Sequence, residues 1–454
     1  MEKLTKLVWY VCLFVVGVMI SIATLENGLL LSVLSFLLVF LFTKKVPIKN
    51  FPLFLFLFSF ITRIVAILLV EIPIQSDYYI MYDAAISVIH GDFSFGKSFY
   101  FSNWGYQLGH VFYQALMLRI WNDVLFLKIL NCVYSSVIVL FVYLLLKKVV
   151  SENSSRMMSL IYSISLYPIY LNMTLSNQPL SLMLTLMGIY FLFHKKYNWI
   201  HLLIAGILIG LGNIERPEGI VYLLTIFLYY VFTLKDVKLI FKNTAIVVIS
   251  SLLITNFVSF AFIKSGVSEI GLKNTNSYWK FLLGFNYDYH GKNNPADNQY
   301  GNSLQKEKEV LFERMTDVKR VPGLFYHKLQ IQWLYSDLEF NFNESHTSKI
   351  SNNMMGIVMN YMKVINLLVI CLAFIGILVQ IRRKNVEKSQ FTNPLYPHIG
   401  LFFMINLLVY FGVYLLIEVN ARYYYNPQIA VILVGGIGLE YVTNWYEERR
   451  RGDY

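Results

Sequence analysis

The sequence predicts an all-α polytopic membrane protein, and three properties of the chain support this fold class. Hydrophobic residues make up 57% of the 454 residues, charged residues make up only 14%, and the mean hydropathy is +0.54. A water-soluble domain carries about 25% charged residues. Apolar runs that approach the ~20 residues needed for a membrane-spanning helix recur along the chain. Together they predict a fold of about twelve transmembrane helices.

The apolar runs divide the chain into four parts. We expect an N-terminal membrane hairpin (1–50), a membrane core (51–262), an outer soluble segment (263–356) and C-terminal membrane helices (357–454). The spans are expected at roughly 7–25, 28–42, 51–70, 123–146, 156–172, 177–194, 199–213, 217–234, 239–262, 357–380, 397–417 and 424–443.

The distribution of Lys and Arg assigns the sides of the membrane. With both termini cytoplasmic, more than half of the 38 Lys and Arg residues fall in inner loops, as the positive-inside rule requires. A span at 106–121 would put Lys147 and Lys148 outside, so we read 106–121 and 78–90 as helices in the outer interface of the loop 71–122. The net charge of +11 is explained in the same way, and no nucleic-acid partner is expected.

Cysteine usage predicts neither a metal site nor a disulfide framework. The three cysteines, Cys12, Cys132 and Cys371, lie far apart inside apolar runs. The N-terminal apolar run is followed at once by a second one without a small-residue cleavage site, so we do not expect a cleavable signal peptide.

Polar side chains gather at the predicted outer ends of the spans, where they are costly to keep beside lipid. Acids and arginines on one face suit an anionic lipid headgroup and a general base. The candidate residues are Asp77, Tyr82, Asp83, Trp104, His110, Asn177, Glu215, Arg216, Glu218, Glu418, Arg422 and Tyr423.

Each candidate also has an ordinary structural interpretation. Either arginine could be a snorkelling anchor at a span end. Glu418 and Arg422 are spaced i,i+4 and could pair with each other. Tyr423 could belong to the interfacial aromatic belt, and His110 could be a packing residue.

In order and sidedness these residues resemble the GT-C class of membrane glycosyltransferases (family 39-like), which contains the protein O-mannosyltransferases and the lipid A aminoarabinose transferase. The similarity rests on an acid in the first outer loop (Ser76-Asp77, then Tyr82), on Arg216-Pro217-Glu218-Gly219, and on Glu418-x-x-x-Arg422-Tyr423 before the last span. The stretch 103–106 is similar to cell-surface members of Gram-positive bacteria. The His-Pro-Pro stretch of many relatives is absent, which leaves the donor headgroup open.

The resemblance implies transfer of a sugar from a polyprenyl-phosphate carrier, within the bilayer, to an extracytoplasmic acceptor such as a cell-wall or surface polysaccharide, or a protein. Asp77 is the expected base, and Arg216 and Arg422 are the expected partners of the donor phosphate. Glu418 and either Glu215 or Glu218 would hold the arginines. Further substrate contacts are expected from Tyr423, Tyr82, Trp104 and Asn177, and no cofactor or metal is expected.

A single carboxylate predicts inversion at the anomeric carbon, because a retaining double displacement needs a second one close by. Asp83 is the nearest candidate, but on a helix it lies about 240° around the axis from Asp77. In the outer segment, Tyr278, Trp279, Phe285, Tyr287 and Tyr289 could stack on sugars or could form a small core.

Two other functions remain open at this point. A polymerase or ligase of surface polysaccharide would concentrate its polar groups in the late loop, whereas Asp77 follows the third span. A transporter or flippase of lipid-linked sugars would place polar groups at mid-membrane in two related halves. The one-sided placement of the charges favours the transferase.

Overall fold

The computed structural model describes residue 8 and residues 10–12, 49–70, 72–194, 198–301, 303–333, 352–382 and 398–451. This part of the chain is helical and contains no strand, which confirms the predicted all-α class. Six of its helices are long and apolar enough to cross a membrane, and three shorter apolar helices accompany them. The predicted spans at 7–25 and 28–42 fall almost entirely outside the described residues.

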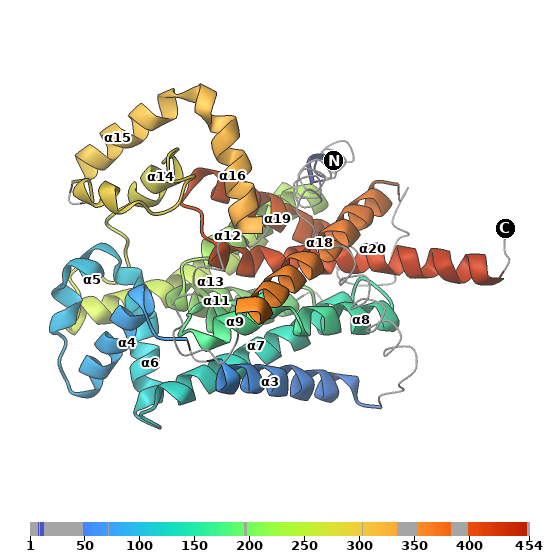
Figure 1. Ribbon diagram of the computed structural model, residues 1–454, viewed down its shortest axis with the longest axis horizontal. Coiled ribbons are helices and arrows are strands. Elements are labelled where there is room, and N and C mark those ends of the chain that lie inside the picture. Colours follow the sequence, from blue (N-terminus) through green and yellow to red (C-terminus); the bar gives the residue numbers. More distant parts are fainter. Residues whose placement is uncertain are drawn as a thin grey trace.

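The membrane part is a bundle of helices, several of which run side by side along the long axis of the molecule (Figure 1). α3 packs against α7, α11 lies between α10 and α13, and α18 packs along α20, around one continuous apolar core. The helices that correspond to predicted spans are α3 (Phe51–Leu69), α7 (Val124–Leu146), α10 (Gln178–Leu192), α11 (Trp199–Glu215), α12 (Gly219–Thr233), α13 (Val237–Lys264), α18 (Asn352–Arg382), α19 (Ile399–Leu416) and α20 (Tyr425–Arg451).

Short polar side chains set where several of these helices begin. Asp123, Asn198 and Asp236 each accept a hydrogen bond from the main-chain N–H two residues further on. Such caps satisfy main-chain donors that have no partner within the helix. The starts of α7, α11 and α13 are therefore encoded locally.

The predicted single span at 156–172 is wrong. The structure has two helices there, α8 (Glu152–Ser163) and α9 (Leu166–Met173). Pro168 explains the break, because it has no N–H to donate to the carbonyl of Ile164 and its ring would clash with that carbonyl in a continuous helix.

The first outer loop connects α3 to α7 and contains the two helices expected at 78–90 and 106–121. They are α4 (Ser76–Ile89) and α6 (Leu108–Leu118), and α5 (Phe99–Asn103) lies between them with two 3-10 turns, η1 (Ser94–Lys97) and η2 (Gly105–Gln107). α4 and α6 pack together around an apolar cluster of their own. At 14 and 11 residues, they are too short to cross a bilayer.

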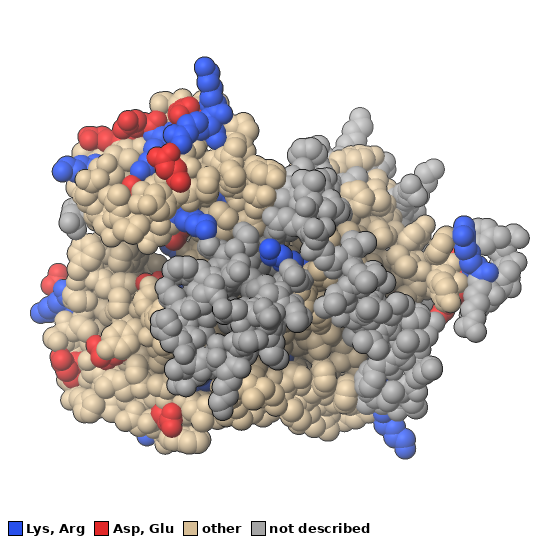
Figure 2. All heavy atoms as spheres, viewed as in Figure 1, with Lys and Arg blue, Asp and Glu red and all other residues tan. Residues whose placement is uncertain are grey.

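The outer segment covers one side of the bundle as a small helical cap (Figure 1). Its helices are α14 (Trp279–Gly284), η3 (Pro295–Gln299), α15 (Leu304–Thr316), η4 (Val318–Arg320) and α16 (Val321–Trp333). Figure 2 shows charged side chains gathered over this cap, as the soluble composition of the segment predicts. Tyr278, Trp279, Phe285 and Tyr287 belong to its small core, whereas Tyr289 is exposed.

Candidate active site

Asp77 and Arg422 meet at the junction between the first outer loop and the last helices. Asp77 lies in the first turn of α4, and Arg422 lies in η6 (Ala421–Tyr424), which joins α19 to α20. Arg422 Nη2 is 3.4 Å from Asp77 Oδ2, across 345 positions of sequence. Ser76, just before Asp77, has a left-handed φ of 54°, a strained conformation that is common at functional sites.

The main chain at Arg422 is held firmly, whereas its side chain has few partners. The side chain of Asn420 accepts a hydrogen bond from Arg422 N at 3.0 Å, and Gln178 Nε2 donates to Arg422 O at 2.8 Å. The guanidinium lies 5.8 Å from the ring centre of Tyr78 and 5.7 Å from that of Tyr423. Its Nε is buried without a hydrogen-bond partner. The long contact with Asp77 is therefore its principal ion pair.

Arg216 is bound more tightly, at the junction between α11 and α12. It forms an ion pair with Glu218 through Nε, and its Nη1 donates to Asn177 Oδ1 at 3.1 Å. Its guanidinium also lies 5.7 Å from the ring centre of Tyr423. Tyr423 therefore contacts both arginines, which brings three of the predicted residues together with Asp77.

Glu215 faces a different partner from the one considered in the sequence. Its Oε2 lies 2.9 Å from His110 Nδ1, and both side chains are buried. The close approach of α6 to α11 requires Gly109, since a Cβ there would lie 2.1 Å from Ile214 O. Of the two acids considered for Arg216, Glu218 is the one that binds it.

Glu418 does not form the i,i+4 pair considered for it. α19 ends at Leu416, so no helical turn connects positions 418 and 422. Tyr423 Oη donates instead to Glu418 Oε2 at 3.0 Å and accepts a hydrogen bond from Lys280 Nζ at 3.3 Å. Lys280 comes from the outer segment, and nothing in its local sequence marks it as a site residue.

Tyr106 belongs to the stretch 103–106 and is affected by the charges of the site, although no role was predicted for it. Burial raises the pKa of its hydroxyl, Lys280 and Arg216 oppose this shift, and Asp77 adds to it. The pKa of Tyr100 is also raised, chiefly by burial, with Asp77 adding to the shift. Both hydroxyls therefore stay protonated.

Trp104 and Tyr82 have other surroundings. Trp104 forms an isolated β-bridge with Asn274 and packs its ring on Tyr100 at 5.1 Å, so it ties the first outer loop to the outer segment. Tyr82 packs against the apolar cluster of α4 and α6, and Asp123 is the charge that affects its hydroxyl. Neither contact brings these side chains to the arginines.

The site thus combines two guanidinium groups and one amine with three carboxylates, those of Asp77, Glu218 and Glu418. Within the described ranges, no group of three or more His, Cys, Asp or Glu side chains is placed to hold a metal ion. Asp83 is exposed on α4 and has no contact with Arg422, as the helical geometry predicted.

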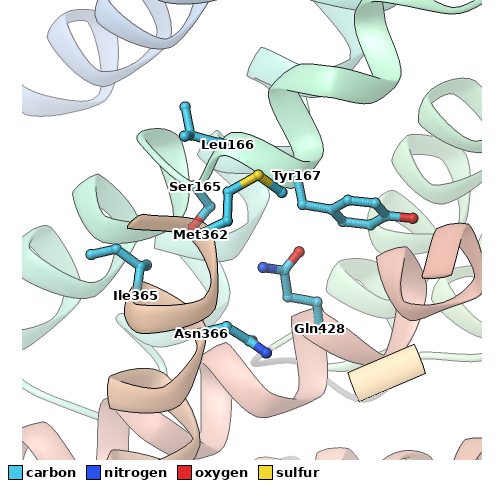
Figure 3. Close-up of a pocket in the computed structure, with 7 residues that line it drawn as sticks. All are labelled: Ser165, Leu166, Tyr167, Met362, Ile365, Asn366 and Gln428. Atoms are coloured by element: carbon cyan, nitrogen blue, oxygen red, sulfur yellow. The ribbon is translucent and has the colours of Figure 1, made fainter. Parts of the chain in front are cut away.

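A small pocket lies between α9, α18 and α20 (Figure 3). The hydroxyl of Tyr167, which lines it, donates to Ala421 O at 2.9 Å, next to Arg422. Its other lining residues are Ser165, Leu166, Met362, Ile365, Asn366 and Gln428.

The sequence has a partial match to a known family. Residues 108–262, from α6 to near the end of α13, match the family model described as dolichyl-phosphate-mannose-protein mannosyltransferase. This match confirms the predicted resemblance to the glycosyltransferases of that group. It includes Asn177 and Arg216 but neither Asp77 nor Arg422.

Among solved structures, the archaeal oligosaccharyltransferase AglB from Archaeoglobus fulgidus, in complex with an inhibitory peptide and a dolichol-phosphate, is similar at a TM-score of 0.45 and 12% identity. The similarity covers 89% of this chain and 51% of that one, so this chain spans about half the length of AglB. No curated protein matches the sequence.

Proposed function

We propose that this protein transfers a sugar from a polyprenyl-phosphate donor to an acceptor on the outer face of the cell membrane. The observation that carries the proposal is the contact between Asp77 and Arg422, with Arg216 close by on the other junction. A carboxylate beside two cations, at the outer ends of membrane helices, provides a base and a phosphate site in one place. The partial family match points to the same chemistry.

In the proposed reaction the phosphate of the donor replaces Asp77 as the partner of Arg422. The ion pair is long enough to be exchanged at low cost, and the exchange frees the carboxylate of Asp77. An acceptor hydroxyl oxygen then bonds to the anomeric carbon while the bond from that carbon to the phosphate oxygen breaks. The hydroxyl proton passes to Asp77, and the electron pair of the broken bond leaves with the lipid phosphate.

Arg216 and Arg422 stabilise the charge that develops on the leaving phosphate. Direct displacement inverts the anomeric centre. Asp83 is exposed, Glu218 is paired with Arg216 and Glu418 accepts from Tyr423, so each of the other candidate carboxylates is otherwise engaged. We also propose that the hydroxyl of Tyr106, whose pKa is affected by the charges of Lys280, Arg216 and Asp77, donates a hydrogen bond to the sugar or to its phosphate. No metal ion takes part in this scheme, because the arginines balance a monophosphate.

The small pocket lined by Leu166, Met362 and Ile365 has room for no more than about one water molecule, so the prenyl chain of the donor is expected to lie outside it. The acceptor that we propose is a cell-wall or surface polysaccharide, with the active site extracytoplasmic and both termini cytoplasmic.

The test is consumption of radiolabelled undecaprenyl-phosphate sugars by the full chain in nanodiscs, with cell-wall polysaccharide as the acceptor. We expect Asp77→Asn to lower turnover by about 10²- to 10⁴-fold, the usual contribution of a general base. Asp83→Asn, the same change on the same helix, is the matched control and should keep wild-type turnover. Radiolabel that moves to protein instead would exclude the glycan acceptor.

Two results would contradict the proposal. Full turnover by a correctly folded Asp77→Asn variant would show that Asp77 is not the general base. Protection of a cysteine at position 77 from a membrane-impermeant reagent added outside intact cells reverses the sidedness on which the donor class depends.

A further inference from the structure

The outer segment inserts a buried lysine into the end of a membrane helix. Lys328 lies on α16 and is 2% exposed. Its Nζ donates to Leu415 O at 2.8 Å and to Ile417 O at 2.6 Å. Carbonyl groups at the C-terminal end of a helix lack partners within the helix and carry a partial negative charge. Lys328 therefore satisfies the end of α19 from an element 87 residues away in sequence.

Two main-chain hydrogen bonds extend the same joint. Glu418 N donates to Lys280 O at 2.7 Å, and Val419 N donates to Gly291 O at 2.8 Å. Position 291 has a φ of 80°, and a Cβ there would lie 2.4 Å from Lys328 Cε, so only glycine allows the loop and the lysine to share this space. The chain from Leu415 to Val419 is thus held by the outer segment at four points.

This arrangement is more demanding than a helix end requires. Burial lowers the pKa of Lys328 to about 7, and only the opposing effect of Glu418 favours the charged amine. A glycine cap or a local side chain would satisfy the same carbonyl groups without burying an amine. These contacts do fix the direction in which the chain leaves α19. Arg422 lies only three residues after Val419, so its position depends on that direction.

We propose that Lys328 is a positioning residue for sugar transfer, which fixes the chain after α19 and thereby sets the place of Arg422 opposite Asp77. This inference rests on the proposed function. The outer segment would then align the phosphate site, because Arg422 reaches its position only when α16 packs against the end of α19. A misplacement of about 1 Å in such a site costs on the order of 10²-fold in rate.

A double-mutant cycle separates positioning from general stability. We expect Lys328→Met to lower kcat/KM for the undecaprenyl-phosphate sugar by about 10- to 100-fold. In an Arg422→Lys background the same change should add less than about threefold, because residues that act through one another are not additive. Lys306→Met, on the exposed face of α15, is the matched control and should leave both backgrounds unchanged.

Hydrogen exchange gives a readout that does not depend on activity. Lys328→Met should raise exchange at residues 417–424 and leave residues 212–218 around Arg216 at the wild-type rate. If Lys328→Met does not fold, Lys328→Arg, which keeps the charge and the donors but not the shape, is measured in the same cycle.

The inference is overturned if the losses of kcat/KM caused by Lys328→Met and by Arg422→Lys multiply fully when the two changes are combined. It is also overturned if a folded Lys328→Met variant keeps wild-type kcat/KM. It is also overturned if exchange at 417–424 does not change. A wild-type protein that transfers no sugar while these exchange rates rise contradicts the proposed function alone.

Discussion

The two arginine junctions of the site are built in opposite ways. At the α11–α12 junction, Arg216 has a close carboxylate, Glu218, and an amide, Asn177, both from within the membrane bundle. At the α19–α20 junction, Arg422 has a fixed main chain, one carboxylate at 3.4 Å and a buried Nε without a partner. The first junction is therefore a completed structural pair, whereas the second leaves capacity for a ligand.

This difference indicates how a phosphate would be bound. Arg216 stays in place as a fixed cation, because replacing Glu218 as its partner would leave that acid without a cation and with only the hydrogen bonds from Tyr410 and Asn426. In the proposed reaction, Arg422 exchanges Asp77 for the donor phosphate, and this exchange frees the carboxylate to act as the base. The guanidinium groups of Arg216 and Arg422 both lie 5.7 Å from the ring centre of Tyr423, so one aromatic ring positions the two cations relative to each other.

The largest effect that the comparison predicts is on folding. Arg216→Ala should destabilise the protein by about 3 kcal/mol, because it leaves Glu218 largely buried without its cation. Thermal unfolding in nanodiscs measures this, and Glu218→Gln in the same background should restore part of the loss. Unchanged thermal stability of Arg216→Ala would mean that the two junctions do not differ as described.

Arg422→Lys should affect turnover instead of stability. A lysine keeps the charge but loses the planar fork that binds a phosphate through two nitrogens. We expect kcat/KM for the donor to fall by about 10²-fold with the melting temperature within about 2 °C of wild type. A variant that melts early but turns over normally per folded molecule would make Arg422 the structural arginine.

Tyr423→Phe should have a smaller effect on both properties. The change removes the hydroxyl that connects Glu418 to Lys280 but keeps the ring between the arginines. Each of the two hydrogen bonds that are lost is worth about 1 kcal/mol, so together they cost up to about 30-fold in kcat/KM. Tyr414→Phe, whose ring stacks on Tyr423 at 5.7 Å, serves as the control. A loss as large as that of Arg422→Lys would give the hydroxyl a direct part in catalysis.

The sequence predicts the helices better than it predicts the partners within the site. The apolar length of α3 or α7 is a local property, so the predicted bounds at 51–70 and 123–146 agree with the structure to within a residue. The break between α8 and α9 also has a local cause, Pro168, which the hydropathy average concealed.

The site was only partly predictable. The predicted topology put Asp77 and Arg422 on the same side of the membrane, and the structure places them in contact. Which acid meets Arg216 depends on the turn after α11, and Glu215 and Glu218 look alike in sequence. Lys280 and Lys328 reach the α19–α20 junction only through the packing of the outer segment, and a lysine in a soluble segment carries no signal of that contact.

The last prediction tests whether the outer segment carries a pH-dependent stability of its own. Glu307 on α15 is 1% exposed, and the effect of burial on its carboxyl outweighs the one opposing interaction, with the side chain of Asn276. Burial raises its pKa from 4.5 to about 7. The folded segment therefore binds a proton more tightly than the unfolded chain, so its stability should fall as the pH rises from about 4.5 to 7 and stay level above that.

Glu307→Gln should remove this dependence and stabilise the segment above pH 7 by about 1–2 kcal/mol, because the neutral amide mimics the protonated acid. Exchange of amide hydrogens in residues 303–333, corrected for the intrinsic effect of pH, measures the change at pH 5 and pH 8. If the Lys328 joint couples the segment to Arg422, protection at 417–424 should follow the same pH difference, while protection around Arg216 should not. If protection from exchange follows the pH difference at neither junction, the α19–α20 junction, like the α11–α12 junction, is held by the bundle alone.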